Sequence, residues 1–147
     1  MPPVLAILTA VVGGILLTIQ VAANRRLGVA LVNPLGCAIT SFVVGLCALL
    51  VCLALYRVPL SGSGARAAPW WAWIGGLMGA FYVASTIVLL PRLGAAALIG
   101  LAIAGQLLSG LAFDHYGWMG VPVHAMGPQR LVGALLLAVG VGLILRS

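Results

Sequence analysis

Long apolar blocks, separated by short breaks rich in polar residues, proline or glycine, make up almost the whole chain. Four blocks reach the length of about 20 residues that a helix needs to cross the hydrocarbon core of a bilayer. These blocks are 4–23, 35–56, 70–90 and 93–113, and a shorter fifth block is 128–145. The pattern predicts an all-α integral membrane bundle with five transmembrane helices in a single domain, 1–147.

The fifth block is long enough to cross the bilayer only if its first residues, 128–130, belong to the helix. Its uninterrupted apolar part, 131–145, is short for a span. Pro128 is suited to the first turn of a helix, and the long Arg130 side chain can reach back to the membrane interface. We therefore expect a fifth span, and this odd number places the two chain ends on opposite faces of the membrane.

The expected connections are short, because irregular backbone cannot face lipid. Residues 24–34 link the first two spans, and Asn33-Pro34 is a typical turn and restart signal. Arg25-Arg26 follow the first block and do not precede it, so we expect that block to be a span and not a signal peptide. The other connections are 57–69 with its Ser-Gly run, the Pro91-Arg92 break, and the aromatic segment 114–127.

Composition supports lipid as the solvent. Only 5% of the residues are charged and 64% are hydrophobic, whereas soluble domains are about 25% charged. The net charge of +6 comes from scattered arginines, which do not form the clustered basic face of a nucleic-acid binder. The three cysteines lack metal-ligand spacing, and no catalytic motif is present. We expect no enzyme activity, catalytic residue, cofactor, metal or nucleic-acid partner.

The arginines divide almost evenly between the two expected faces. A marked excess on one side would fix the orientation of the chain. Without it, the chain can insert both ways, and opposite copies can form an antiparallel pair. The alternative is one fixed topology, set by the Arg25-Arg26 pair with help from a partner. One face would carry Arg57, Arg66 and Arg130, and the other Arg25, Arg26, Arg92 and Arg146.

Polar side chains inside the expected spans are the candidate solute contacts, because lipid cannot satisfy their hydrogen bonds. Gln20 and Asn24 share one helical face, and Gln106 lies in the middle of the fourth span. Tyr82 can offer its hydroxyl or its ring face to a cation. The alternatives are inter-helix hydrogen bonding for the amides, a helix-ending role for Asn24, and core packing for Tyr82.

Two further groups of residues are structural or coupling candidates. Small residues let helix backbones approach closely, which makes Gly75, Gly79, Gly105 and Gly133 expected packing positions. Asp114-His115 joins an acid to a group that titrates near neutral pH, so the pair is a candidate for proton coupling. The more ordinary interpretation of Asp114-His115 is an interfacial cap or a salt bridge to an arginine.

An ordered set of motifs along nearly the whole chain resembles the YdcZ-type family of the drug/metabolite transporter superfamily. The set reads Gln20-xxx-Asn24-xx-Leu27, Asn33-Pro34, Ser41-Phe42-xx-Gly45, Gly75-Gly76-xx-Gly79, Pro91-Arg92-Leu93-Gly94, Gly105-Gln106, Asp114-His115-Tyr116-Gly117 and Arg130-xx-Gly133. The resemblance implies a small five-span protein of the bacterial inner membrane. It also implies an antiparallel dimer whose ten helices imitate the inverted repeat of larger transporters.

Together these observations predict a transporter for a small polar or amphipathic metabolite, working by alternating access around a midplane cavity. Gln20, Asn24, Tyr82 and Gln106 are the expected cavity residues. The dimer partner is either a second copy or a homologous chain. A passive dimeric channel and a non-transporting subunit that needs a homologous partner are the alternative functions.

Overall fold

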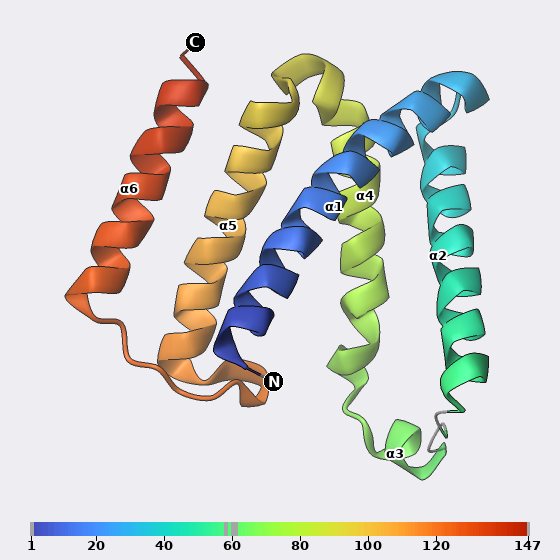
Figure 1. Ribbon diagram of the computed structural model, residues 1–147, viewed down its shortest axis with the longest axis horizontal. Coiled ribbons are helices and arrows are strands. Elements are labelled where there is room, and N and C mark those ends of the chain that lie inside the picture. The colour runs from blue at the N-terminus through green and yellow to red at the C-terminus, as the bar shows by residue number, and fades with distance from the viewer. Residues whose placement is uncertain (1, 58, 60–61, 147) are drawn as a thin grey trace. The chain divides into compact units, whose positions relative to one another are not determined.

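The computed structural model describes residues 2–57, 59 and 62–146, and the regular structure in these residues is helical (Figure 1). The chain forms two compact units, Met1–Arg92 and Leu93–Ser147. Four of the described helical segments are long and apolar enough to cross a membrane: Pro3–Leu31, Pro34–Tyr56, Trp70–Leu93 and Ala95–Tyr116. The all-α prediction is confirmed, and at least four of the expected spans are present.

The first helix, α1 (Pro3–Leu31), is longer than predicted. Residues 24–31 were expected to begin a connection, and this prediction was wrong because nothing in them interrupts a helix. The interruption comes at Pro34, which disfavours helical backbone in the residue before it. Asn33 is accordingly extended, with φ −149° and ψ 110°. At 1.5 Å per residue α1 is about 43 Å long, so its arginine-bearing turns can extend past a hydrocarbon core of about 30 Å.

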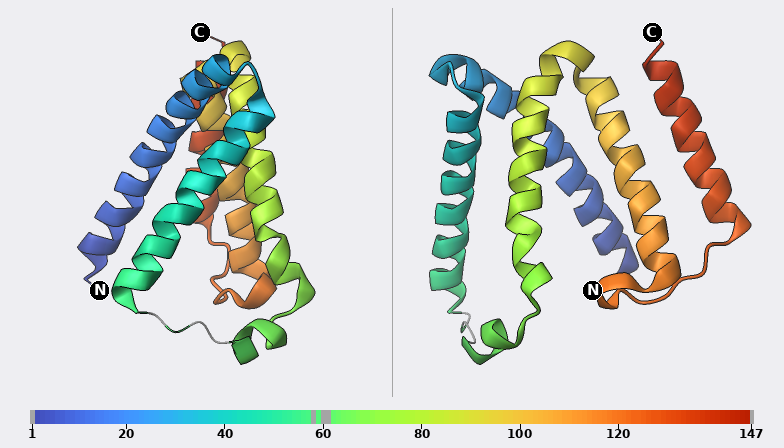
Figure 2. Two further views of the ribbon diagram at one scale, coloured as in Figure 1. Left: turned by 90° about the vertical axis from the view of Figure 1, so that its right-hand side faces the viewer. Right: turned by 180° about the vertical axis from the view of Figure 1, so that it is seen from behind.

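The second helix, α2 (Pro34–Tyr56), lies within one residue of the predicted span. The Asn33 side-chain oxygen accepts hydrogen bonds from the backbone N–H groups of Leu35 (3.0 Å) and Gly36 (3.2 Å). This cap satisfies donors that the first helical turn leaves free. From their joint at Asn33, α1 and α2 diverge toward their far ends (Figure 2).

The remaining helices of the first unit are α3 (Gly62–Ala67), the 3₁₀ turn η1 (Trp70–Ile74) and α4 (Gly75–Leu93). A break had been expected at Pro91-Arg92, but both residues lie inside α4. Proline removes one intrahelical hydrogen bond and crowds the carbonyl four residues earlier, and Pro91 stands only two residues before the end of α4 at Leu93. The helix ends instead at Gly94, whose φ of +76° is readily adopted by glycine.

The core of the first unit lies where α1, α2 and α4 meet. It consists of Cys37 and Ala38 from α2 with Val83 and Ile87 from α4, and Leu27 of α1 packs against it. The Cys37 thiol is fully buried and donates a hydrogen bond of 2.8 Å to the Asn24 carbonyl oxygen.

Close approach of the three helices depends on Gly28 of α1. A Cβ atom at this position would lie 3.2 Å from Cγ2 of Ile87 and 3.7 Å from Cβ of Cys37. Both distances are at or below ordinary carbon–carbon contact. The absent side chain therefore allows α1 to contact both neighbouring helices.

The second unit is a helical hairpin of α5 (Ala95–Tyr116) and α6 (Pro128–Ile144), with the 3₁₀ turn η2 (Trp118–Gly120) in its connection. A Cβ at Gly100 would lie 3.2 Å from Cγ2 of Val141, so the two helices also meet closely at a glycine. With 17 residues, α6 is shorter than the four long helices. It would extend about 26 Å.

Candidate functional site

A groove of about 360 Å³ lies on the first unit between α1, α2 and α4. Gln20 and Ser41 supply polar groups to a wall that is otherwise made of apolar side chains and a glycine. The apolar part consists of Phe42, Gly45, Leu46, Leu49 and Val83. A volume of this size suits one small ligand, and a few polar groups in an apolar lining are typical of small-molecule sites.

The Ser41 hydroxyl differs from its neighbours on the same helices. Thr18 and Thr40 each donate to the carbonyl oxygen one turn earlier, at 3.1 Å and 2.9 Å. Within the part of the chain that the structure describes, the Ser41 hydroxyl has no such partner. It is half-buried in the groove wall, where a ligand or water can bond to it.

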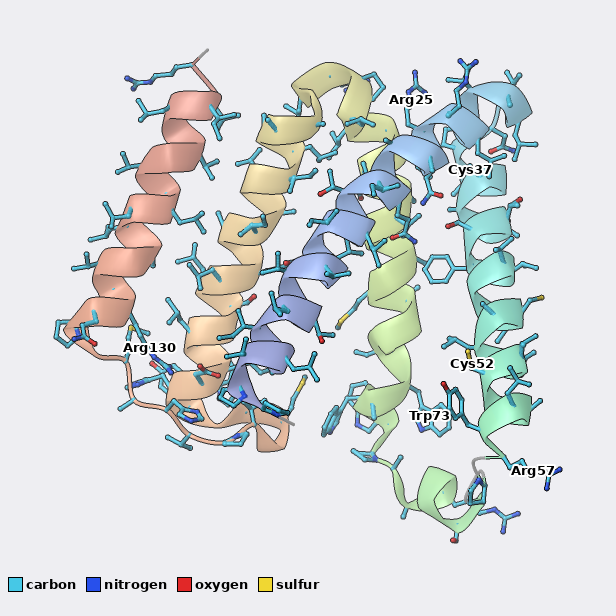
Figure 3. The ribbon with its side chains drawn as sticks, viewed as in Figure 1. Arg25, Cys37, Cys52, Arg57, Trp73 and Arg130 are labelled. Atoms are coloured by element: carbon cyan, nitrogen blue, oxygen red, sulfur yellow. The ribbon has the colours of Figure 1, made fainter. Side chains whose placement is uncertain are left out.

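Asn24 lies one turn beyond Gln20 on α1 and is 6% exposed. Its backbone carbonyl accepts the Cys37 thiol bond, near the joint of α1 and α2 (Figure 3). Asn24 is not part of the groove lining, so its role as a cavity residue stays a prediction.

The other two predicted cavity residues occupy different surroundings. Tyr82 is half-buried and packs against the core cluster of Cys37 and Val83. Gln106 is exposed on α5, in the second unit. The structure thus brings Gln20, Asn24 and Tyr82 into one unit, and whether Gln106 joins them stays a prediction.

The four predicted packing glycines are only partly explained by contacts within the described chain. A Cβ at Gly79 would lie 3.6 Å from the Phe42 ring, in ordinary contact. At Gly75, Gly105 and Gly133 the added atom would meet nothing within 4 Å. Tighter positions are Gly28 and Gly100 within the helices, which belong to none of the quoted motifs, and Gly117 after α5, where a Cβ would lie 2.7 Å from Cγ2 of Val123. Gly28 could have been found by extending the first helix to Pro34.

Asp114 forms a salt bridge with Arg130, which is labelled at the lower end of the second unit in Figure 3. Its Oδ2 atom lies 2.9 Å from Nη1 of Arg130, and the two side chains are 34% and 39% exposed. The same guanidinium donates to the His124 carbonyl oxygen at 3.3 Å. The His124 N–H donates to the Asp114 carbonyl oxygen at 2.7 Å. These bonds join the end of α5 to the start of α6.

His115 and the aromatic residues complete this end of the hairpin. The Met126 N–H donates to Nδ1 of His115 at 3.3 Å. Tyr116 stacks on Trp118, with ring centroids 5.1 Å apart, and Trp118 meets Phe113 edge-on at 5.7 Å. Aromatic and basic residues of this kind are common at the membrane–water interface. The contacts show how the Asp114-His115 segment is held, and a role for it in proton coupling stays a prediction.

The chain was compared with known proteins. The profile of the family described as "Putative inner membrane exporter, YdcZ" matches residues 5–143. The chain belongs to the YdcZ family. It is also 42% identical over 78 residues to "Inner membrane protein YdcZ" of Escherichia coli (strain K12). That alignment covers 52% of this chain and 51% of the relative, so the chain spans about half the length of the curated relative it matches.

Membership in the YdcZ family confirms two of the expectations drawn from the sequence. The resemblance itself is confirmed, and so is the multi-pass inner-membrane location, which the long apolar helices also support. The description of the family supports membrane transport as the general function, and it is not an enzyme family. No solved structure matches the chain significantly.

Proposed function

We propose that this YdcZ protein transports a small polar or amphipathic solute as an antiparallel dimer of five-span copies, by alternating access. The groove between α1, α2 and α4 is the observation that carries the proposal. It offers Gln20 and Ser41 on a surface that is otherwise apolar. Polar groups at membrane depth are costly unless they bind something, and a transported solute supplies that partner.

A five-span copy requires α6 to cross the bilayer. Its length of about 26 Å is close to the hydrocarbon thickness of about 30 Å. Arg130 stands at its first turn and pairs with Asp114, so that end has the polar side chains expected at an interface. Slight local thinning or reach of the flanking arginines can absorb the remaining difference.

Near-equal arginine numbers support insertion in both orientations. Within the first unit, Arg25 lies near the joint of α1 and α2, and Arg57 lies at the far end of α2 (Figure 3). With all five helices crossing, one face carries three arginines and the other carries four. Neither face then has a clear excess to hold it in the cytoplasm. Opposite copies around one axis in the membrane plane would form an inverted repeat with a shared cavity.

Topology mapping in intact cells tests the dimer. Cys37 is kept because it is buried, Cys47 and Cys52 are replaced by alanine, and Gly62→Cys places one exposed thiol between α2 and α4. A membrane-impermeant maleimide should label about half of the copies from outside, as dual insertion requires. The same protein with Arg57 and Arg66 changed to glutamine should shift strongly to one orientation. Labelling of all copies, or of none, in the parent contradicts a self-paired antiparallel dimer.

Flux measurements in proteoliposomes test the transport mode. A carrier that alternates access gives saturable uptake and counterflow of the solute. Linear uptake without counterflow would indicate a passive pore in place of a carrier. Reconstitution that shows uptake only after a homologous chain is added would identify this protein as one subunit of a mixed pair.

A further inference from the structure

We infer that the groove on the first unit binds an uncharged amphipathic solute, with its hydrogen-bonding group between Gln20 and Ser41 and its apolar face against Phe42. This inference rests on the proposed transport function, because it names the class of solute that the same groove would carry. It depends on three features of the groove: an available hydroxyl, an available amide and a lining without ionisable groups.

The Ser41 hydroxyl is the first feature. In a membrane helix a hydroxyl usually bonds to the carbonyl one turn earlier, as Thr18 and Thr40 do here. Ser41 stands next to Thr40, yet its hydroxyl makes no bond to another residue of the described ranges. Its position in the groove wall makes it a donor and an acceptor for whatever enters.

The carboxamide of Gln20 is the second feature. An amide has two donors and an acceptor oxygen to satisfy, and Gln20 stands on the α1 side of the groove while Ser41 stands on the α2 side. A solute with a hydroxyl, amide or ring N–H can bond to both walls.

The third feature is the absence of charge among the seven lining residues. An ion that enters an apolar groove without a counter-charge loses far more hydration energy than a neutral molecule does. Phe42, Leu46 and Leu49 offer ring and aliphatic surface in its place. The lining therefore favours a neutral molecule with one apolar face over an organic cation or anion.

A lipid acyl chain is the main competitor for the groove. It would cover the leucine side chains well, but it has no group to bond to Gln20 or Ser41. Hydroxyl and amide groups left unpaired in hydrocarbon are unfavourable. A neutral solute with polar groups satisfies both walls, and the structure favours it for this reason.

Thiol chemistry tests whether the groove is hydrated. With Cys47 and Cys52 replaced by alanine, Ser41→Cys is compared in nanodiscs with Thr40→Cys, its neighbour outside the groove lining. The parent, which has Cys37 alone, gives the background rate. The neutral polar reagent 2-hydroxyethyl methanethiosulfonate should modify Ser41→Cys at least about tenfold faster than Thr40→Cys. Equal rates would overturn the inference, and so would a Ser41→Cys thiol that reacts in detergent but not in lipid, which indicates an acyl chain in the groove.

Binding of matched probes tests the charge preference. The probes are 2-(4-fluorophenyl)ethanol, the 2-(4-fluorophenyl)ethylammonium cation and the 4-fluorophenylacetate anion, observed by ¹⁹F NMR with empty nanodiscs as the blank. The neutral probe should bind saturably and at least about tenfold more tightly than either ion. Ser41→Ala and Gln20→Leu should each weaken it about three- to tenfold, the range for one lost hydrogen bond, while Thr40→Ala should leave it unchanged.

The outcomes separate this inference from the proposed function. Equal binding of the three probes, or equal binding to Ser41→Ala, Gln20→Leu and the parent, overturns the solute class. The Gly62→Cys topology result and any saturable transport would still stand in that case. Protein with single-sided topology but selective neutral binding in the groove would instead overturn the self-paired dimer and leave the inference intact.

Discussion

Placing a methyl group at Gly28 should loosen the first unit, because α1 meets both α2 and α4 at this residue. In the Gly28→Ala variant the new Cβ would lie 3.2 Å from Cγ2 of Ile87, and 3.7 Å from Cβ of Cys37. Carbon atoms prefer separations of about 3.5–4.0 Å, so α1 or Ile87 must move by a few tenths of an ångström. Ile87 is 1% exposed and has little room to do so.

Two opposing effects determine how much Gly28→Ala changes the free energy of unfolding. Overpacking of a tight interior costs about 1–3 kcal/mol, while glycine-to-alanine replacement within a helix favours folding by up to about 1 kcal/mol. Gly14 lies on the same helix, and a Cβ there would meet nothing within 4 Å. The Gly14→Ala variant therefore has the propensity gain without the contact. The difference in unfolding free energy between the two variants isolates the packing cost, which we expect to be about 1–3 kcal/mol.

Reversible unfolding in mixed micelles of a mild detergent and dodecyl sulfate, followed by tryptophan fluorescence, measures this difference. Ile87→Leu removes the branching Cγ2 atom and keeps the side-chain volume, so it should recover at least about half of the loss when combined with Gly28→Ala. Equal stability of Gly28→Ala and Gly14→Ala would refute the close approach of the three helices. If Ile87→Leu does not reduce the destabilisation caused by Gly28→Ala, the contact with Ile87 is not what makes the added methyl group unfavourable.

Three further perturbations address other parts of the molecule. Asp114→Asn should lower the free energy of unfolding by less than about 1 kcal/mol, because the salt bridge between Asp114 and Arg130 is partly exposed. Calorimetry with and without added salt measures this loss. Complete loss of proton-driven uptake with unchanged stability would instead indicate that Asp114 couples transport to protons. Trp118→Ala should cost about 1 kcal/mol through its stack with Tyr116, with faster amide hydrogen exchange confined to the α5–α6 connection. The Cys37 thiol should react with maleimide in detergent only after unfolding, because it is fully buried, and early reaction would show that the core is open.

Helix positions could be predicted from the sequence wherever apolar length and a nearby proline act together. The helix α2 begins and ends within one residue of the predicted span 35–56, because Asn33 caps the helix and Pro34 starts it. The helix α1 continues to Leu31, beyond the predicted end of the first span before the two arginines. Charge limits how far a helix lies in hydrocarbon, but it does not end the helical backbone. The backbone of α1 turns into the left-handed region at Val32 (φ 52°, ψ 21°), and Asn33 is then extended, as the residue before a proline prefers.

The sequence allowed us to predict which polar residue lines the candidate site, but not which hydrogen bonds the side chains there make. Gln20 was identified because an amide inside an apolar block needs a partner, and the structure places it in the groove. Ser41 was noted only within the motif Ser41-Phe42-xx-Gly45 and not as a contact for a solute. Its availability depends on whether its hydroxyl bonds to its own helix, and that geometry is not visible in the order of residues. The neighbouring Thr40 has the same kind of side chain and does bond in this way.

The glycines that the sequence suggested for helix packing are not the ones that the described contacts require. Gly75, Gly105 and Gly133 were expected to be packing positions because small residues let helices approach closely, yet an added Cβ at each would meet nothing within 4 Å in the described chain. Gly28 and Gly100 are the helical positions at which an added Cβ would meet a neighbouring helix at 3.2 Å. Among the described residues of each unit, no contact at Gly75, Gly105 or Gly133 offsets their cost to helix stability. In the proposed antiparallel dimer their smooth surfaces can face the partner helices, so crosslinks through these three positions, absent at Gly14, are the contacts that such a dimer should form.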